Sequence, residues 1–99
     1  MLRCTIVSPA QKKVIEGLEG IFLKTVTGEI GILTGHIAIV TQLRDGTVAR
    51  LKAAGAREIR VQIGASSFFR FDADEGTILT EDFSVSAETT PASPPGPPP

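Results

Sequence analysis

GEIGILTGH, residues 28–36, combines three glycines with three large aliphatic residues and ends on the only histidine of the chain. Glycine adopts positive φ without strain, so this spacing predicts a sharp bend or a close approach of backbone. Ile30, Ile32 and Leu33 favour burial, which is unusual for a polar loop, while a regular strand seldom carries so many glycines. We therefore expect a tightly bent crossing here, and we expect function to lie in it.

The segments around this stretch have the character of short β-strands. Alternation is strict in residues 58–63, where Ile59, Val61 and Ile63 alternate with polar residues. In residues 67–71 we expect Phe69 and Phe71 on one face and Phe68 and Arg70 on the other. Pro9, Gly17 and the pair Asp45-Gly46 are predicted to end strands or form turns. The expected strands are 2–7, 12–16, 18–26, 37–40, 47–52, 58–63, 67–71 and 77–80. Residues 37–40 are expected to be a short buried segment, and Gly20 is expected to mark a bulge or close contact.

This pattern predicts an all-β domain of about eight to ten short strands, a sandwich or a barrel. The chain has 99 residues, enough for one small domain, and its core must be aliphatic because it contains five Phe and neither Trp nor Tyr. After Phe83 the composition becomes small and polar, and six of the seven prolines fall within 91–99. We expect residues 1–83 to form the domain and residues 84–99 to be a disordered proline-rich tail.

Charge and composition exclude several classes of function. The net charge is −1 and charges of both signs are interleaved, which disfavours nucleic-acid binding and a polybasic membrane anchor. No window approaches the roughly 18 apolar residues of a membrane span, and the start of the chain does not resemble a signal peptide. The single cysteine cannot form an internal disulfide and fits a reducing compartment. We expect a soluble, cytoplasmic protein without direct membrane insertion.

No arrangement of residues predicts catalysis. Cys4 and His36 are too few ligands for zinc, and Cys4 lies in an apolar strand where thiols are inert. The acidic run 72–76 begins like a calcium loop but lacks the later ligands. We expect no catalytic residue, no metal, no cofactor and no small-molecule ligand. On spacing alone, His36 fixes a bend by a hydrogen bond and Glu29 is solvated.

The stretch from Thr25 to His36 resembles the epsilon subunit of F-type ATP synthase, a small rotor subunit of the central stalk. The family's motif there is glycine, glutamate, aliphatic, glycine, two aliphatics, proline, glycine and histidine. Similar material extends over residues 3–83, including 7–9, 14–17, 45–48 and 76–81. Thr34 and Ala38 stand where the family usually has proline, which predicts a looser loop.

The resemblance implies a flattened antiparallel β-sandwich of ten strands that contacts the gamma subunit and the membrane c-ring. Carried over by position, it assigns Glu29, Ile30 and Gly31 to the ring contact, with Gly28 at its start, and His36 to the junction of gamma and ring. The family's sandwich is followed by a helical hairpin, for which residues 84–99 are too short and too rich in proline.

The implied function is that of a non-catalytic rotor subunit, peripheral on the cytoplasmic side of the plasma membrane. It would couple proton translocation to ATP synthesis, and we expect it to lack the ATP-sensing inhibitory arm. Two other classes stay open: a free-standing adaptor that recruits a partner through residues 91–99, and a small enzyme, for which no set of converging titratable residues is evident.

Overall fold

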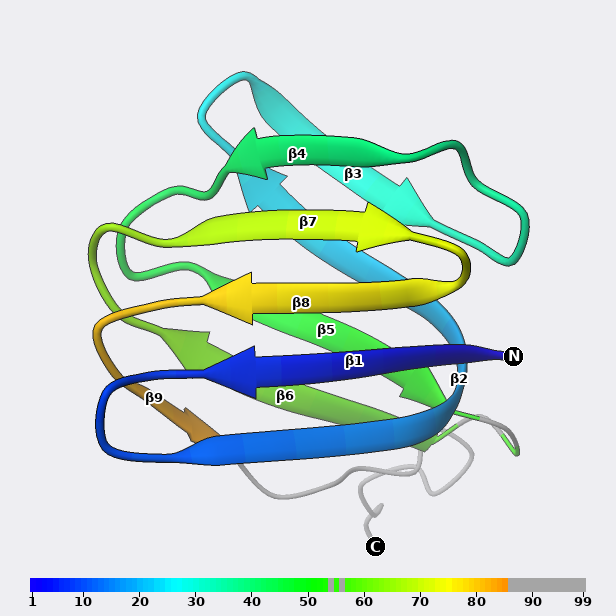
Figure 1. The fold of residues 1–99 in the computed structure, drawn as a ribbon, viewed down its shortest axis with the longest axis horizontal. Helices are drawn as coiled ribbons and strands as arrows, with labels where there is room; N and C mark the ends of the chain where they lie inside the picture. Colours follow the sequence, from blue (N-terminus) through cyan, green and yellow to red (C-terminus); the bar gives the residue numbers. More distant parts are fainter. Residues whose placement is uncertain (54, 56, 86–99) are drawn as a thin grey trace, which may run out of the picture.

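The computed structural model describes residues 1–53, 55 and 57–85 of the chain. Within them it contains nine strands and no helix (Figure 1). This confirms the all-β prediction and the expected strand count. The strands are β1 (Leu2–Val7), β2 (Lys12–Thr25), β3 (Gly28–Ile32), β4 (Ile39–Gln42), β5 (Val48–Ala53), β6 (Arg57–Ile63), β7 (Phe68–Asp72), β8 (Glu75–Leu79) and β9 (Phe83–Val85).

The strands form one continuous sheet that folds over on itself into two layers. Its order is β4-β7-β8-β1-β2-β5-β6-β9, and β3 pairs with β2 outside this path. In Figure 1 the strands β4, β7, β8 and β1 cross the front, while β5 and β6 lie behind them at an angle. All neighbours are antiparallel except β1 and β8, which are parallel. The long strand β2 connects the layers, pairing with β1 in its first half and with β3 and β5 in its second.

Strand β2 corrects the prediction of two strands separated at Gly17. The strand runs without interruption because Gly17 adopts φ +70° and lies in a bulge. The bulge falls where the register with β1 shifts, between the cross-strand pairs Leu2–Leu18 and Cys4–Ile15. A bulge adds one residue and bends the strand without ending its pairing. A second register shift lies between Leu18 and Gly20 in the pairing with β5, as expected for Gly20. These two irregularities accompany the passage of β2 from one layer to the other.

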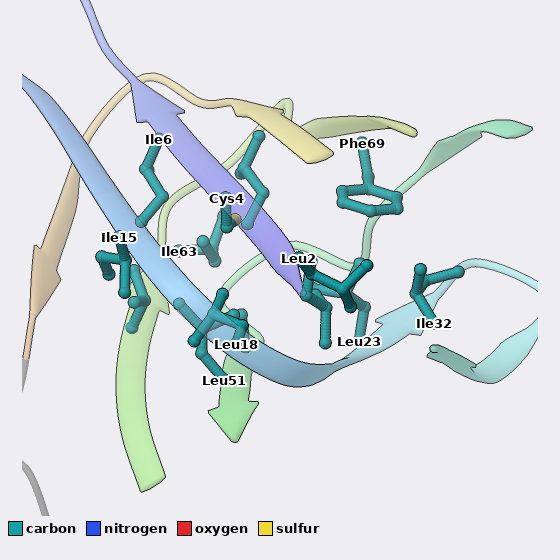
Figure 2. Packing of buried hydrophobic residues seen from close by; sticks show 14 of the residues in the cluster. Leu2, Cys4, Ile6, Ile15, Leu18, Leu23, Ile32, Leu51, Ile63 and Phe69 are labelled. Atoms are coloured by element: carbon teal, nitrogen blue, oxygen red, sulfur yellow. The ribbon is translucent and has the colours of Figure 1, made fainter. Parts of the chain in front are cut away.

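The core lies between the two layers and is almost entirely aliphatic. Figure 2 shows side chains from β1, β2, β3, β5, β6 and β7 meeting in this interior. Phe69 and Phe71 lie on one face of β7 as the alternation predicts; both are buried, and their rings stack with centroids 6.4 Å apart. Burying apolar surface stabilises the folded state by about 25 cal/mol per Å², so this core is the main source of stability.

Two further expectations about burial and strand ends need correction. Residues 37–40 were expected to be a short buried segment, but Ile37 is 78% exposed and Val40 is 72% exposed. Ile37 lies in the loop before β4, and Val40 points to the outer face while its neighbour Ile39 packs against the core. Strand β9 was not predicted, and it extends past the expected boundary at residue 83. The tail expected at residues 84–99 lies outside the described residues from residue 86 onward.

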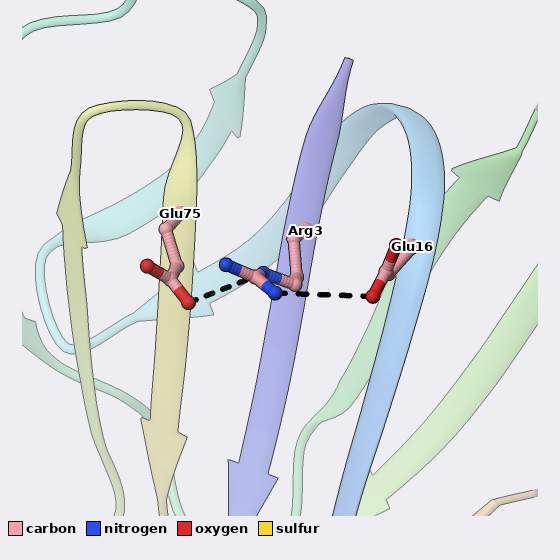
Figure 3. Close-up of polar contacts among 3 residues, drawn as sticks. All are labelled: Arg3, Glu16 and Glu75. Atoms are coloured by element: carbon pink, nitrogen blue, oxygen red, sulfur yellow. Dashed lines mark ion pairs between the residues drawn. The ribbon is translucent and has the colours of Figure 1, made fainter.

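Arg3 is the centre of a group of ion pairs on the surface of one layer. Arg3 on β1 reaches Glu75 of β8 at 3.2 Å and Glu16 of β2 at 3.8 Å, so one guanidinium spans three neighbouring strands (Figure 3). All three side chains are at least 48% exposed, which leaves such ion pairs screened by water and of small energetic value.

Candidate partner-binding site

Gly28–Ile32 forms the regular strand β3, which corrects the prediction of a bent crossing. The strand pairs with the second half of β2 and has no partner on its other side within the described chain. Gly28 has φ +138°, and its carbonyl accepts a 2.7 Å hydrogen bond from the Thr25 hydroxyl, which closes the β2–β3 hairpin. Positive φ therefore occurs at Gly28 and again at Gly35 (φ +86°) near the end of this stretch, and not at Gly31 between them.

Gly31 is needed for space and not for its backbone angle. A Cβ atom on Gly31 would lie 2.9 Å from the Phe22 ring, and one on Gly20 would lie 2.8 Å from the same ring. The ring therefore covers both glycines on the outer face of the sheet. Arg50 and Lys52 stand over it, with cationic atoms 5.5 and 5.6 Å from the ring centroid. Sequence spacing could not reveal this reason for Gly31, because Phe22 belongs to another strand.

Glu29 and Ile30 point to opposite sides of β3, as neighbours in a strand must. Glu29 is exposed beside its cross-strand partner Lys24, and it helps to line a small pocket together with Phe22 and Arg50. Ile30 is half-buried and packs against the core. Of these two expected contact residues, only Glu29 offers its side chain to a partner.

His36 lies past the other end of β3, in the loop that leads to β4. Its backbone N–H donates to the Leu33 carbonyl at 3.0 Å, its Nδ1 lies 2.7 Å from the Ile37 carbonyl, and its ring packs edge-on against Phe71 at 6.0 Å. Next to it, the Gly35 N–H donates to the Asp74 carboxylate at 3.0 Å. These contacts hold the loop against β7 and the β7–β8 turn, and the partner-contact role expected for His36 stays a prediction.

The five expected site residues thus follow a single edge of the sandwich without converging. Gly28 and Glu29 lie at the β2–β3 hairpin, near the top left of Figure 1, while the loop with His36 lies at the right. Strand β3 separates them, with Ile30 and Gly31 between. The arrangement offers an extended edge to a partner and does not form a pocket for chemistry.

An exposed apolar face is a second candidate surface that the sequence did not reveal. Phe68 is 46% exposed and Leu79 50% exposed, and they are directly paired across β7 and β8. Leu79 is also paired with Val7 of β1, and Val40 of β4 lies beside Arg70 on the same outer face. Phe68, Leu79 and Val7 thus form an apolar row across β7, β8 and β1, and Arg70 and Gln42 lie between this row and Val40. Exposed apolar surface marks an interaction site when it is large enough. The residues of this surface come from four strands, so no local sequence motif predicts it.

The described residues contain no group of three or more His, Cys, Asp or Glu side chains that could hold a metal ion. Burial raises the pKa of the Cys4 thiol to about 12, which leaves it protonated and unreactive. Among the same residues, no helix has the length and apolar character to cross a membrane.

Comparison with known proteins identifies the fold family. Residues 1–86 match the family described as "ATP synthase, Delta/Epsilon chain, beta-sandwich domain". The ATP synthase epsilon chain of Mycobacterium avium (strain 104) is 35% identical over 68 residues, which are 69% of this chain and 55% of that protein. The epsilon chain of Mycobacterium sp. (strain KMS) is 37% identical over 59 residues, or 60% of this chain and 47% of that protein. The chain therefore spans about half the length of these curated relatives.

The fold agrees with a solved structure. A chain of the Euglena gracilis mitochondrial ATP synthase, from a cryo-EM structure of its OSCP, F1 and c-ring, superimposes with a TM-score of 0.74 and 23% sequence identity. The match covers 83% of this chain and 51% of that one. The solved structure supports the fold, and the family match over residues 1–86 shows that the chain belongs to the delta/epsilon chains of ATP synthase through their β-sandwich domain.

Proposed function

We propose that this chain acts as the epsilon-type rotor subunit of an F-type ATP synthase, linking the gamma subunit to the c-ring. The observation that carries the proposal is the family match over residues 1–86, which includes every described strand. The Euglena neighbour belongs to an assembly that contains F1 and a c-ring, which supports the same setting for this chain.

The apolar outer face is the surface we assign to gamma. Phe68, Leu79 and Val40 present exposed apolar area on three strands of one layer, and burying it would be favourable at about 25 cal/mol per Å². A sheet face is also rigid, because each strand is fixed by its neighbours and by the core below. A surface that transmits torque benefits from such stiffness, since close-packed interiors have low compressibility.

The β3 edge and the loop after it are the surface we assign to the c-ring. Glu29 is exposed and charged at the hairpin end, and the loop at the other end is held by His36 and Gly35. Together these groups extend along one side of the sandwich, which suits a contact with several neighbouring ring subunits. In this assignment Glu29 makes the polar contact, and His36 keeps the loop in shape.

The subunit is non-catalytic in this proposal and works mechanically. Proton flow turns the ring, and the sandwich rotates with gamma as one body on the cytoplasmic side of the membrane. The expected loss of the inhibitory arm concerns residues beyond the described ones, and it stays a prediction. Hydrolysis that becomes ATP-sensitive only when this chain is present would contradict it.

The test is a pull-down with the tagged 99-residue chain from membranes of its own organism, with partners identified by mass spectrometry. We expect recovery of gamma and c subunits, and loss of c but not gamma when Glu29 and His36 are both changed to alanine. Because His36 packs on Phe71, Glu29→Gln is the second variant, and it leaves the loop intact.

Three outcomes separate the alternatives. Recovery of both subunits with no effect of either variant would keep the rotor assignment and discard the β3 edge as the ring contact. Recovery of neither subunit would overturn the rotor assignment. If another partner were then lost on deletion of residues 91–99, the adaptor function would replace it.

A further inference from the structure

The layer formed by β2, β5 and β6 carries a basic pocket on its outer face. Two of its lining residues, Lys24 and Arg50, also border the smaller pocket that Glu29 lines. The basic pocket has a volume of about 640 Å³, within the range of small-ligand sites. Its lining is rich in cationic side chains and includes one carboxylate among the described residues. The residues that matter for its chemistry are Lys24, Arg44, Arg50, Arg60, Gln62 and Asp45.

Strand register brings the cations together. Phe22, Arg50 and Arg60 are consecutive cross-strand partners on β2, β5 and β6, and Lys24 follows Phe22 on the same face two residues later. Arg44 is brought to the rim because its backbone N–H donates to the Lys24 carbonyl at 3.0 Å and its Nε donates to the Thr25 carbonyl at 3.1 Å. Like charges at such short range repel, so their clustering costs stability unless an anion is present.

Three of these cations have no carboxylate at ion-pair distance in the described part of the chain. They are Lys24, Arg44 and Arg50. Arg60 differs, because its Nε pairs with Glu58 at 2.9 Å. The Asp45 carboxylate accepts a hydrogen bond from the Ser66 N–H at 3.2 Å, which directs one of its oxygens to another loop. The pocket is therefore left with a net positive charge.

The pocket wall is held in place before any ligand arrives. The Gln62 amide donates to the Gly46 carbonyl at 2.7 Å, which ties β6 to the turn before β5. The Arg50 guanidinium rests over the Phe22 ring, which in turn covers Gly20 and Gly31. Thr47, another lining residue, has a buried hydroxyl that makes no hydrogen bond within the described chain. A fixed set of donors of this kind favours an anion with several oxygens.

We propose that this pocket binds a compact multivalent phosphate anion of the pyrophosphate or tripolyphosphate type. Arginine presents a planar fork of donors that matches phosphate, and several cations in one concavity suit several charges on one ligand. A concave site also fits a small anion better than an extended acidic peptide. The site binds through the phosphate groups, so a free polyphosphate and the phosphates of a nucleotide are both candidate sources. This departs from the sequence-based expectation of no small-molecule ligand.

The experiment is calorimetric titration of the purified 99-residue chain with sodium tripolyphosphate at low ionic strength. We expect saturable binding of one anion per chain, weakened by added salt. Arg44→Gln and Arg50→Gln each remove a charge-assisted contact and are expected to weaken binding roughly tenfold or more. Arg70→Gln is the matched control, because Arg70 is an exposed arginine on the opposite layer, and it should change binding less than about twofold.

Competition distinguishes the sources and the classes of ligand. If ATP and tripolyphosphate displace each other with similar affinity, the phosphates alone are recognised, and much tighter ATP binding at the same residues identifies a nucleotide as the source. Tighter binding of a hexaglutamate peptide than of tripolyphosphate would overturn the proposal in favour of an acidic partner. The absence of saturable tripolyphosphate binding, or equal weakening by Arg70→Gln, would also overturn it. Thermal unfolding of each variant shows whether Arg50→Gln has disturbed the fold, and Arg44→Gln repeats the test away from Phe22.

Discussion

The two outer faces of the sandwich differ although one continuous sheet forms both. The face of β4, β7, β8 and β1 exposes Val40, Phe68 and Leu79, while the face of β2, β5 and β6 exposes lysine and arginine around a pocket. Apolar surface is suited to burial against a large partner, and clustered cations are suited to an anion. The same fold therefore carries two kinds of recognition, which are set only by the residues at alternate strand positions.

The comparison also separates stability from binding. Inner-facing residues of both layers pack into one core, in which they are buried or half-buried, so the core does not distinguish the faces. Changes on the inner side are expected to alter the free energy of unfolding, and changes on the outer side are expected to alter association. The predictions below use neighbouring positions of one strand, or matched positions of the two layers, to test this separation.

Thiol labelling should give the largest contrast between the inner and outer sides. Cys4 faces the core and Val14 is 43% exposed on the outer side, paired with the neighbouring Thr5. At pH 8, native Cys4 should react at least about a thousandfold more slowly than the cysteine of a Cys4→Ala, Val14→Cys chain, because labelling of Cys4 requires opening of the core. The rates are measured with a chromogenic disulfide reagent. Equal rates would place Cys4 outside a stable core.

The same thiol gives the pH dependence of stability. Its pKa is raised by burial from 9.0 to about 12, so the folded state retains the proton that the unfolded state releases. This contribution is complete below pH 9.0 and is lost progressively as the pH rises from 9.0 toward 12. Cys4→Ala should remove this part of the alkaline loss, which urea unfolding at several pH values would detect.

Phe69→Ala and Phe68→Ala compare adjacent positions of β7. Phe69 is fully buried and Phe68 is 46% exposed. Phe69→Ala should lower the free energy of unfolding by about 3–5 kcal/mol because it leaves a cavity in the core. Phe68→Ala should lower it by less than about 1 kcal/mol. Urea denaturation measures both, and similar losses would mean that the outer face also holds the fold together.

Glycine-to-alanine changes compare the two sides on a smaller scale. A Cβ on Gly76 would lie 2.9 Å from the buried Phe69 ring and 3.2 Å from Ile21, whereas a Cβ on Gly31 would meet only the surface ring of Phe22. Gly76→Ala should cost about 1–3 kcal/mol because the core cannot yield. Gly31→Ala should cost less, and Phe22→Leu in the same chain should remove most of that cost. Urea denaturation of Gly31→Ala, of Phe22→Leu and of the double variant gives the coupling free energy between the two positions.

The ion pairs of Arg3 should give the smallest effect. Arg3→Gln removes contacts with Glu75 and Glu16 on an exposed surface, and the free energy of unfolding should change by less than about 1 kcal/mol. The difference should shrink further at high salt. A loss comparable to that of Phe69→Ala would show that a surface network rather than the core fixes β1 between β2 and β8.

Sequence reasoning succeeded where a feature depends on one strand. The alternation that places Phe68 and Phe69 on opposite faces is local, and so is the turn signal of Asp45-Gly46 between β4 and β5. It failed where a residue's role depends on another strand. The glycines of residues 28–36 argued against a regular strand, yet Gly31 lies in β3. The strand has a glycine at this position because a side chain would collide with the Phe22 ring.

The same limit explains the two outer faces. Val40, Phe68 and Leu79 are separated in sequence, and strand register alone brings them to one surface. Lys24, Arg44 and Arg50 are gathered in the same way, while the overall charge of −1 conceals them. Family resemblance supplied the fold and the residues of the β3 edge, but neither the apolar face nor the basic pocket.

The central claim is that the apolar outer face, and not the basic one, binds gamma. It is tested most directly by measuring the affinity of the purified chain for the gamma subunit of its own organism. Phe68→Asp should weaken binding at least about thirtyfold, while Val48→Asp, an equivalent change on the basic layer, should alter it less than about threefold. Loss of binding on Val48→Asp with no effect of Phe68→Asp would contradict the assignment of the two faces.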